Sequence, residues 1–287
     1  MTTILLSPQL TTAAAEIRTI LEQLLPAETT HNSLYAAMRY SALAEGKALR
    51  GFLTLATATM LNVPRHYALR VTAAIEMIHC YSLVHDDLPA MDNDDWRRGK
   101  PSCHIAFGEA TAILVGDGLL TFAFQLLAHP STHPDATIRC LLIEALTKAI
   151  GPEGMVGGQN IDIQHSIETF EDISTLHRLK TGALFAVSCE AGAILSGADP
   201  TLQHRMRCYG EQLGIAFQIY DDIEDYHHPK HAQPELSNIV RVLGPEQARG
   251  HAENAITQAL EALRPLGSNA AELITLLECL PDFFSLD

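Results

Sequence analysis

The chain has 287 residues, of which 47% are hydrophobic and 18% charged, so it has enough apolar sequence for a sizeable core and too few charges for wholesale disorder. Its formal net charge of −15 disfavours nucleic acid and anionic membranes as partners, because both would be repelled. An anionic ligand would need local basic groups or bridging cations.

The cysteines and the N-terminus both favour a soluble cytoplasmic protein. The six cysteines have no CxxC spacing and several lie in apolar runs, which indicates buried, reduced thiols. The first residues, "MTTILLSPQL", lack the basic start and long apolar run of a signal peptide. The most apolar long stretch, "GALFAVSCEAGAILSG", contains Glu190 and is too short to span a membrane.

Apolar residues recur with helical spacing along almost the whole chain, and alternating strand-like runs are absent. Breaks rich in proline and glycine separate segments that are long enough for substantial helices. No Gly/Ser-rich linker or low-complexity tract divides the chain, so we expect one all-α domain over residues 1–287. In chain order, the expected breaks are Pro26, Pro64, 129–135, 151–154, 196–200, 227–234 and 244–247.

The segment 73–87, "AAIEMIHCYSLVHDD", is predicted to be a mostly buried helix that carries one polar stripe. Its polar residues follow each other at steps of three or four, which places them on a single helix face. They are Glu76, His79, Ser82 and Asp86.

A dense cluster of charges follows this helix. Five aspartates lie within residues 86–95, and two arginines and a lysine lie within residues 97–100. Like charges at this density repel each other, and a buried carboxylate is costly unless a positive partner offsets it. A solvated acidic loop is one interpretation of the cluster, and a metal site is the other.

A second segment, residues 208–226, repeats this pattern in "CYGEQLGIAFQIYDDIEDY". Its polar stripe ends in Asp221, Asp222 and Asp225, which can share one helix face. If the two helices face each other, their stripes line a cavity. Two carboxylate clusters favour a hard cation such as Mg²⁺, which bridges to substrate phosphates, and the basic residues 97–100 then act as phosphate donors.

These motifs resemble those of the short-chain trans-prenyl diphosphate synthases, specifically the bacterial farnesyl diphosphate synthases. Both aspartate-rich motifs of that family are present, and several further family segments occur in the same order over residues 35–225. The matching segments are "GKALR" (46–50), "DDLPAMD" (86–92), "RRG" (97–99), "GGQNIDI" (157–163), "LKTGALF" (179–185), "FQ" (217–218) and "DDIED" (221–225).

The resemblance implies the isoprenoid synthase fold, a bundle of long helices around a deep central cavity, and a homodimer. It also implies Mg²⁺-dependent head-to-tail condensation of isopentenyl diphosphate with dimethylallyl or geranyl diphosphate. Bound metal would neutralise the leaving diphosphate, and a dry cavity would protect the allylic cation from water.

The resemblance further implies roles for single residues. The metal ligands would be Asp86, Asp87, Asp92, Asp221, Asp222 and Asp225. The allylic diphosphate and the allylic cation would be contacted by Arg97, Lys180, Thr181 and Gln218. Isopentenyl diphosphate would be bound by Lys47, Arg50, His79 and Arg98.

Several of these residues also have a purely structural interpretation. Lys47 and Arg50 are spaced like surface charges on a helix, and a histidine on a buried stripe is often a core residue. Thr181 could bond to the backbone of its own helix. Gln159 and Asp162 would support the ligands without touching the substrate.

Tyr81 is predicted to set the product length. It lies five residues before Asp86, where the family often places an aromatic side chain as the floor of the cavity. This position favours a C15 product, with C10 as the alternative. Tyr81 could also simply pack in the core.

The family pattern breaks down after Asp225. The usual G-K pair and K-[ST]-[ST]-[YF]-P segment are replaced by "YHHPKHAQPE" and "LSNIVRVLG", in which Leu236 takes the place of a lysine and Lys230 lacks the G-K context. The chain ends in "LPDFFSLD", without the basic tail of many relatives. We therefore expect a mobile loop at 227–235 and weakened allylic binding.

This divergence leaves two alternative functions open. One is a weakly active or non-catalytic homologue or subunit that binds prenyl diphosphates. The other is a diverged enzyme that makes a non-standard linkage or a cyclised terpene.

Overall fold

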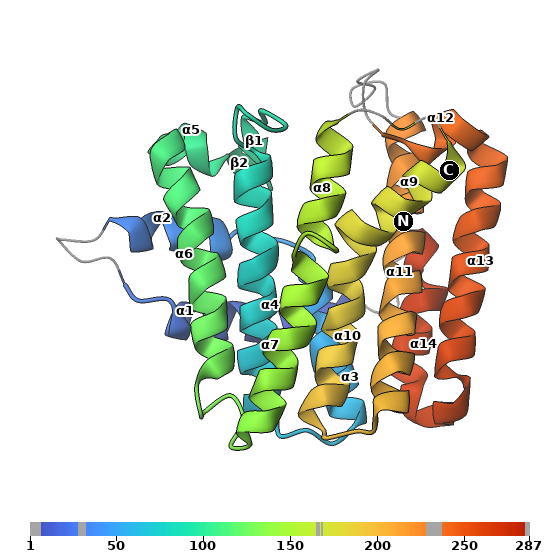
Figure 1. Cartoon of the computed structure of the whole chain (residues 1–287), viewed down its shortest axis with the longest axis horizontal. Coiled ribbons are helices and arrows are strands. Elements are labelled where there is room, and N and C mark those ends of the chain that lie inside the picture. The colour runs from blue at the N-terminus through green and yellow to red at the C-terminus, as the bar shows by residue number, and fades with distance from the viewer. Residues whose placement is uncertain (1–6, 28–32, 165–166, 168, 228–236, 285–287) are drawn as a thin grey trace. The chain divides into compact units, whose positions relative to one another are not determined.

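The structure is a computed structural model, and it describes residues 7–27, 33–164, 167, 169–227 and 237–284. The all-α prediction is confirmed, since helices account for almost all of the regular structure in these ranges (Figure 1). The only strands in the described part are two short ones that form a hairpin, β1 (Trp96–Arg97) and β2 (Lys100–Pro101).

The helices fall into an N-terminal and a C-terminal series. The first series is α1 (Ser7–Leu24), α2 (Leu34–Ala42), α3 (Leu49–Met60), α4 (Arg65–Asp86), α5 (Cys103–Phe107), α6 (Glu109–Ala128) and α7 (Ala136–Ile150). The second is α8 (Met155–Ile163), α9 (Phe170–Leu176), the π-helix η1 (His177–Gly182), α10 (Ala183–Leu195), α11 (Pro200–His227), α12 (Ile239–Leu243) and α13 (Pro245–Leu263). The chain continues with η3 (Arg264–Ala270), α14 (Ala271–Glu278) and η4 (Leu280–Phe283).

The breaks fall close to where proline and glycine predict them. Segment 129–135 separates α6 from α7, and segment 151–154 separates α7 from α8. The break expected at 244–247 is shorter, because only Gly244, with φ 80°, lies between α12 and α13. Pro245 instead begins α13, where a missing N–H and a preset φ are compatible with the helix.

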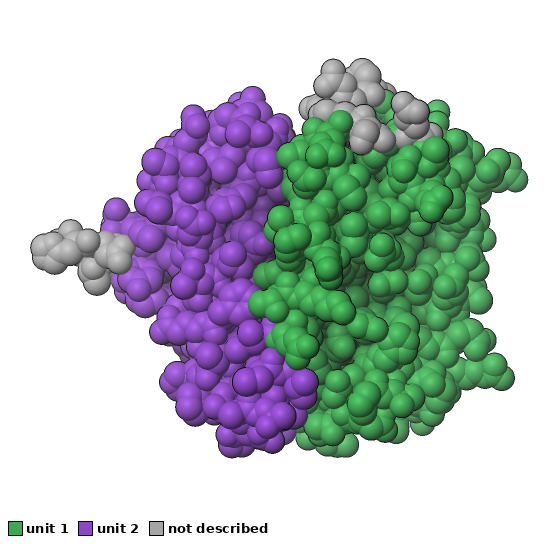
Figure 2. All heavy atoms as spheres, viewed as in Figure 1, with its two compact units in different colours: residues 1–8, 56–63, 144–287 green, residues 9–55, 64–143 purple. Residues whose placement is uncertain are grey.

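The chain divides into two compact units (Figure 2). Unit 1 comprises residues 1–8, 56–63 and 144–287, and unit 2 comprises residues 9–55 and 64–143. Helices α3 and α7 each contribute to both units. The single domain over residues 1–287 stays a prediction.

All six cysteines are free thiols. Four of them, Cys80, Cys103, Cys189 and Cys279, are buried, while Cys140 is exposed. Burial raises the pKa of Cys80 to about 12, so its thiol stays protonated and unreactive at neutral pH.

Helix α4 is the centre of unit 2, where it packs against α6 and α2. Its side chains from Ala73 to Ile78 are buried, including Glu76. Near its end, the ring of His85 lies against Gly116 of α6, where an added Cβ would be 1.9 Å from Nε2. Nε2 donates to the Ile113 carbonyl at 3.1 Å, so α6 holds the residue that precedes Asp86.

Helix α11 has the same central place in unit 1, between α10 and α13 (Figure 1). Two glycines of α11 let α10 and the end of η1 approach it closely. A Cβ at Gly210 would lie 2.5 Å from the Phe185 carbonyl oxygen, and one at Gly214 would lie 2.9 Å from the Cα of Gly182. The nearest atoms at both positions belong to the backbone, so they cannot move aside as the end of a flexible side chain could.

We predict that Gly210→Ala lowers the free energy of unfolding by about 1–3 kcal/mol, because the methyl group would overpack the contact with α10. Gly250→Ala is the matched control, since no atom lies within 4 Å of the Cβ position in the exposed part of α13. There the substitution should stabilise by roughly 0.5–1 kcal/mol through helix propensity. Urea unfolding followed by circular dichroism measures both, and equal effects at the two positions would contradict the packing argument.

Candidate functional site

The first aspartate motif begins at Asp86, the last residue of α4 in unit 2, and its members differ in exposure. Asp86 is half-buried and Asp92 is exposed, whereas Asp87 is only 2% exposed. The carboxylate of Asp87 accepts hydrogen bonds from Nε and Nη2 of Arg97 at 2.8 and 2.5 Å. Arg97 also donates to Asp94 at 2.8 Å, so one guanidinium offsets two of the clustered charges.

The β1–β2 hairpin positions the two arginines. Its two-residue turn consists of Arg98 and Gly99, with φ of 54° and 75°. Two successive left-handed residues give the type I′ turn that matches the twist of a hairpin. A left-handed conformation is costly for arginine, and such strain is common at functional positions.

Arg98, Arg50 and His79 converge in unit 2, although they come from the hairpin, α3 and α4. The guanidiniums of Arg50 and Arg98 each lie 3.4 Å from Nε2 of His79. A Cβ at Gly46 would be 2.8 Å from Cζ of Arg98, so the glycine of "GKALR" makes room for that guanidinium. Three of the four residues predicted to bind isopentenyl diphosphate thus lie together.

This cluster is strongly basic and its histidine is neutral. Burial, together with Arg50 and Arg98, lowers the pKa of His79 well below its ordinary value. Neutral His79 can therefore accept hydrogen bonds at Nε2 from both guanidiniums. Burial also lowers the pKa of Arg50 to about 10, while Glu76 opposes the shift.

Glu76 anchors the helix that carries Arg50. Its Oε1 accepts a hydrogen bond of 2.7 Å from the backbone N–H of Gly51, in the first turn of α3. Amides in a first helical turn have no partner within the helix, so a buried carboxylate is a fitting acceptor.

Lys47 and Lys100 occupy different surroundings. Lys47, the fourth residue of the predicted isopentenyl set, is exposed at the start of this region. The ammonium group of Lys100 donates to the Tyr40 carbonyl and lies 3.8 Å above the Tyr40 ring. Lys100 is therefore engaged with α2, although its sequence position suggested a phosphate donor.

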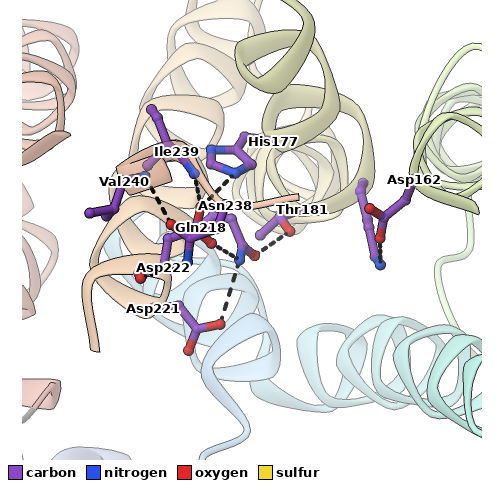
Figure 3. Close-up of polar contacts among 10 residues, drawn as sticks. Asp162, His177, Thr181, Gln218, Asp221, Asp222, Asn238, Ile239 and Val240 are labelled. Atoms are coloured by element: carbon purple, nitrogen blue, oxygen red, sulfur yellow. Dashed lines mark hydrogen bonds and ion pairs between the residues drawn. The ribbon is translucent and has the colours of Figure 1, made fainter. Parts of the chain in front are cut away.

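The second aspartate motif lies on α11 in unit 1 (Figure 3). Asp221 and Asp225 are half-buried, and Asp222 is 5% exposed. Oδ1 of Asp222 accepts from Gln218 at 3.0 Å, and Oδ2 accepts from the backbone N–H of Ile239 at 2.8 Å. Nε2 of His177 lies 3.2 Å from the same Oδ2.

The π-helix η1 brings three side chains to this region. Besides His177, it carries Lys180, whose Nζ lies 2.5 Å from Oδ2 of Asp162 on α8. It also carries Thr181, whose hydroxyl donates to Oε1 of Gln218 at 2.8 Å. Thr181 thus contacts α11 through its side chain, and Lys180 contacts Asp162 on α8. π-Helices are rare and occur frequently at functional sites.

Tyr81 is buried in unit 2, one helical turn before His85 on α4. The two rings meet edge to face, with centroids 5.9 Å apart. Burial and the nearby Asp86 raise the pKa of Tyr81 to about 12. The packing of the ring is compatible with either a cavity floor or a core residue, so its role stays a prediction.

The carboxylates fit a metal ion that is shared with a ligand. Among the described residues, no group of three or more His, Cys, Asp and Glu side chains lies close enough to hold a metal ion alone. Mg²⁺ does not require such a cage, because it usually takes one or two carboxylates, waters and substrate phosphates. The oxygen-only donors and the partial exposure of Asp86, Asp92, Asp221 and Asp225 suit this kind of site.

Some expectations lie outside the described residues, and some contacts had no signal in the sequence. Lys230, Leu236 and the loop expected at 227–235 fall almost wholly in the undescribed segment 228–236.

Two residues that contact Asp222, His177 and Asn238, were not identified from the sequence, because neither belongs to a periodic polar pattern. For His177, its place three residues before Lys180 of the family segment was the one available cue.

The comparisons with known proteins agree with the motifs. The family model for polyprenyl synthetase matches residues 31–234. The farnesyl diphosphate synthase of Geobacillus stearothermophilus is 49% identical over 195 residues, which is 67% of this chain and 66% of that protein. The farnesyl diphosphate synthase of Escherichia coli K12 is 39% identical over 264 residues, 86% of each chain.

Two solved structures are similar over nearly their full length. An apo FPP/GFPP synthase from Zymomonas mobilis has a TM-score of 0.88 at 41% identity, covering 95% of this chain and 97% of that one. A geranyltransferase from Legionella pneumophila has a TM-score of 0.85 at 33% identity, covering 96% of both. With its motifs, its helical fold and these relatives, the chain belongs to the polyprenyl synthetase family.

Proposed function

We propose that this prenyltransferase condenses isopentenyl diphosphate head to tail with dimethylallyl or geranyl diphosphate and makes farnesyl diphosphate as its main product. The observation that carries the proposal is the convergence of Arg50, His79 and Arg98 on one atom, His79 Nε2. Two guanidiniums held together by a neutral acceptor form a preorganised site for a diphosphate. The farnesyl diphosphate synthases among its relatives support the substrates and the product.

Isopentenyl diphosphate would bind in unit 2. Arg50 and Arg98 would each donate to its phosphate oxygens, and exposed Lys47 would add a third positive charge. Glu76 keeps the first turn of α3, and with it Arg50, in place. Because the positive charges are already close together, binding of the anionic diphosphate relieves their mutual repulsion.

Each aspartate motif would bind Mg²⁺ of the allylic diphosphate, through Asp86 and Asp92 in unit 2 and through Asp221 and Asp225 in unit 1. Asp87 and Asp222 were also predicted as ligands, but both side chains are buried, so we assign them to holding each motif in shape. Mg²⁺ bound there would neutralise the diphosphate as it leaves. Arg97 and Lys180, each paired with an aspartate, would add positive charge beside that group.

Thr181 and Gln218 would face the carbon that becomes positive. Their hydrogen bond directs the Thr181 proton to Oε1 of Gln218, which leaves a hydroxyl lone pair to face developing positive charge. The double bond of isopentenyl diphosphate would then attack that carbon as its C–O bond to the leaving diphosphate breaks. The new carbocation would lose a proton to the released diphosphate, which leaves the double bond of the product. Neither residue needs to change its protonation state.

We predict that purified protein forms labelled prenyl diphosphate from labelled isopentenyl diphosphate and either allylic substrate only when Mg²⁺ is present. Asp86→Ala and Asp221→Ala should each lower turnover by roughly 100-fold or more, because a bound metal contributes several kcal/mol of charge stabilisation. Asp95→Ala, in the same loop but outside the motif, should leave turnover unchanged. Full turnover in excess chelator would show that no metal takes part.

We propose that Tyr81 closes the cavity below the first aspartate motif. The prenyl chain grows by one isoprene unit at a time until it reaches the Tyr81 ring. The ring would thereby stop chain growth after 15 carbons. The edge-to-face contact with His85, itself held by Gly116, would keep the ring in place.

Tyr81→Ala should therefore lengthen the main product beyond C15, since loss of the ring deepens an apolar space by a side-chain volume. Tyr67→Ala is the control, because it removes the same side chain from the same helix about 21 Å away. Chromatography of the dephosphorylated products separates the chain lengths. An active Tyr81→Ala enzyme with a wild-type product distribution would mean that another residue forms the floor.

We also propose a cytoplasmic homodimer that associates through α5 and α6. Helix α6 is the one helix in the described ranges that is long and apolar enough to cross a membrane, with a mean hydropathy of 1.6. On α5 and α6, four large apolar side chains are exposed: Ile105, Phe107, Ile113 and Leu114. The family resemblance implies a homodimer, and a second copy of the chain would cover such an apolar face.

Light scattering after gel filtration without detergent should give twice the chain mass of 31.3 kDa. Leu114→Glu should shift the protein to a monomer, because Leu114 is 54% exposed on this face and a charge there would be buried in the interface. Gln258→Glu, which adds the same charge on α13, should leave the dimer intact. A wild-type protein that stays in solution only with detergent would contradict the proposal.

A further inference from the structure

Asn238 has two hydrogen-bonding roles at the start of α12 (Figure 3). Its Oδ1 accepts from the backbone N–H of Val240 at 2.8 Å and thereby caps the helix. Its Nδ2 donates to the backbone carbonyl of Asp222 on α11, also at 2.8 Å. The same side chain therefore begins one helix and ties it to another.

The next residue adds a second hydrogen bond between the start of α12 and Asp222. The backbone N–H of Ile239 donates to Oδ2 of Asp222 at 2.8 Å. Asp222 is thus bonded by this segment at both its main chain and its side chain. Because Asp222 is 5% exposed, water cannot replace the Ile239 donor, and losing that bond would leave a buried charge poorly compensated.

The effect of α12 extends to the residues that would meet the substrate. Gln218 donates to Oδ1 of Asp222 at 3.0 Å, lies 3.5 Å from Oδ2 of Asp221, and accepts from Thr181. His177, which begins η1, contacts Asp222 at 3.2 Å. A rotation of the Asp222 carboxylate would therefore disturb both the Gln218 amide and the π-helix that carries Thr181.

We propose that Asn238 is a positioning residue for the allylic half of the site, acting through Asp222 on Gln218 and on the second aspartate motif. The inference rests on the proposed function, because it names the residue that holds this motif in its working geometry. Asn238 itself touches neither substrate nor metal. It acts on unit 1 alone, whereas Arg50, His79 and Arg98 belong to unit 2.

The test distinguishes the two hydrogen bonds of the Asn238 side chain, the one that caps α12 and the one to the Asp222 carbonyl. Asn238→Asp keeps an oxygen that can accept from Val240 but removes the N–H donor and adds a charge beside Asp222. Asn238→Thr supplies one hydroxyl that can accept and donate together, as in the family segment K-[ST]-[ST]-[YF]-P. Asn254→Asp, on an exposed position of α13, controls for the added charge.

Three kinds of measurement are made on each full-length variant, with thermal unfolding as a check on the fold. Calorimetry with inorganic diphosphate and Mg²⁺ reports binding without turnover. Steady-state kinetics give separate KM values for geranyl and isopentenyl diphosphate. Amide hydrogen exchange reports the bond from Ile239 to Asp222.

For Asn238→Asp we expect about 10-fold weaker diphosphate binding and a similar rise in the KM for geranyl diphosphate, the low end of the effect of losing an outer-shell partner at a metal site. The KM for isopentenyl diphosphate should stay within about 2-fold, since the change is local to the other substrate. The Ile239 amide should exchange faster. Asn238→Thr should recover most of the binding, and Asn254→Asp should match the wild type.

Wild-type diphosphate binding and KM values in Asn238→Asp would overturn the proposal. So would an equal rise in both KM values with a large fall in melting temperature, because the residue would then support the fold in general. If the wild type forms no prenyl product at all, the proposed function fails, while calorimetry and hydrogen exchange still decide whether Asn238 positions a diphosphate site.

Discussion

Several carboxylates lie close together beside an apolar interior, and the need to offset their charges is the constraint on which the rest of this structure depends. Each motif meets it in the same way, by turning its second aspartate into the protein and surrounding it with donors. Arg97 serves Asp87, while Gln218 and the Ile239 amide serve Asp222. With the middle charge offset, the outer aspartates of each motif keep partial exposure, which lets an external cation reach them.

The basic residues face the opposite problem, because positive charges that are held close together also repel each other. Arg50 and Arg98 approach the same atom, although their charges repel, and a neutral imidazole between them makes this possible. Burial keeps His79 neutral, and Glu76 supplies a negative charge at the base of α3. A protonated histidine here would lose its acceptor and add a third like charge, so the burial of α4 is part of the chemistry of this cluster.

Much of the architecture was predictable because it is local. Apolar periodicity and the proline and glycine breaks located the helices. The polar stripe predicted at Glu76, His79, Ser82 and Asp86 includes the two residues that contact the start of α3, Glu76 and His79. The contacts of Arg97 with Asp87 and of Asn238 with Asp222 were not predictable, because they depend on how the chain after each helix turns back onto it, and helical periodicity does not describe such turns. The left-handed Arg98 was also missed, since arginine is seldom the residue that marks such a turn. The resemblance to a family supplied the roles, which spacing alone could not.

The π-helix η1 has a consequence for how this site can change through evolution. A π turn holds one residue more than an α turn, and here that turn sends His177 and Thr181 to α11 and Lys180 to α8. Deleting one residue would let this segment close as an α-helix, and its side chains would then no longer all keep their directions toward α11 and α8. Substitutions in η1 can be accepted one side chain at a time, whereas a change in its length would break several contacts at once. We therefore expect a change in the number of residues in this turn to disturb the site more than the substitution of any one of them.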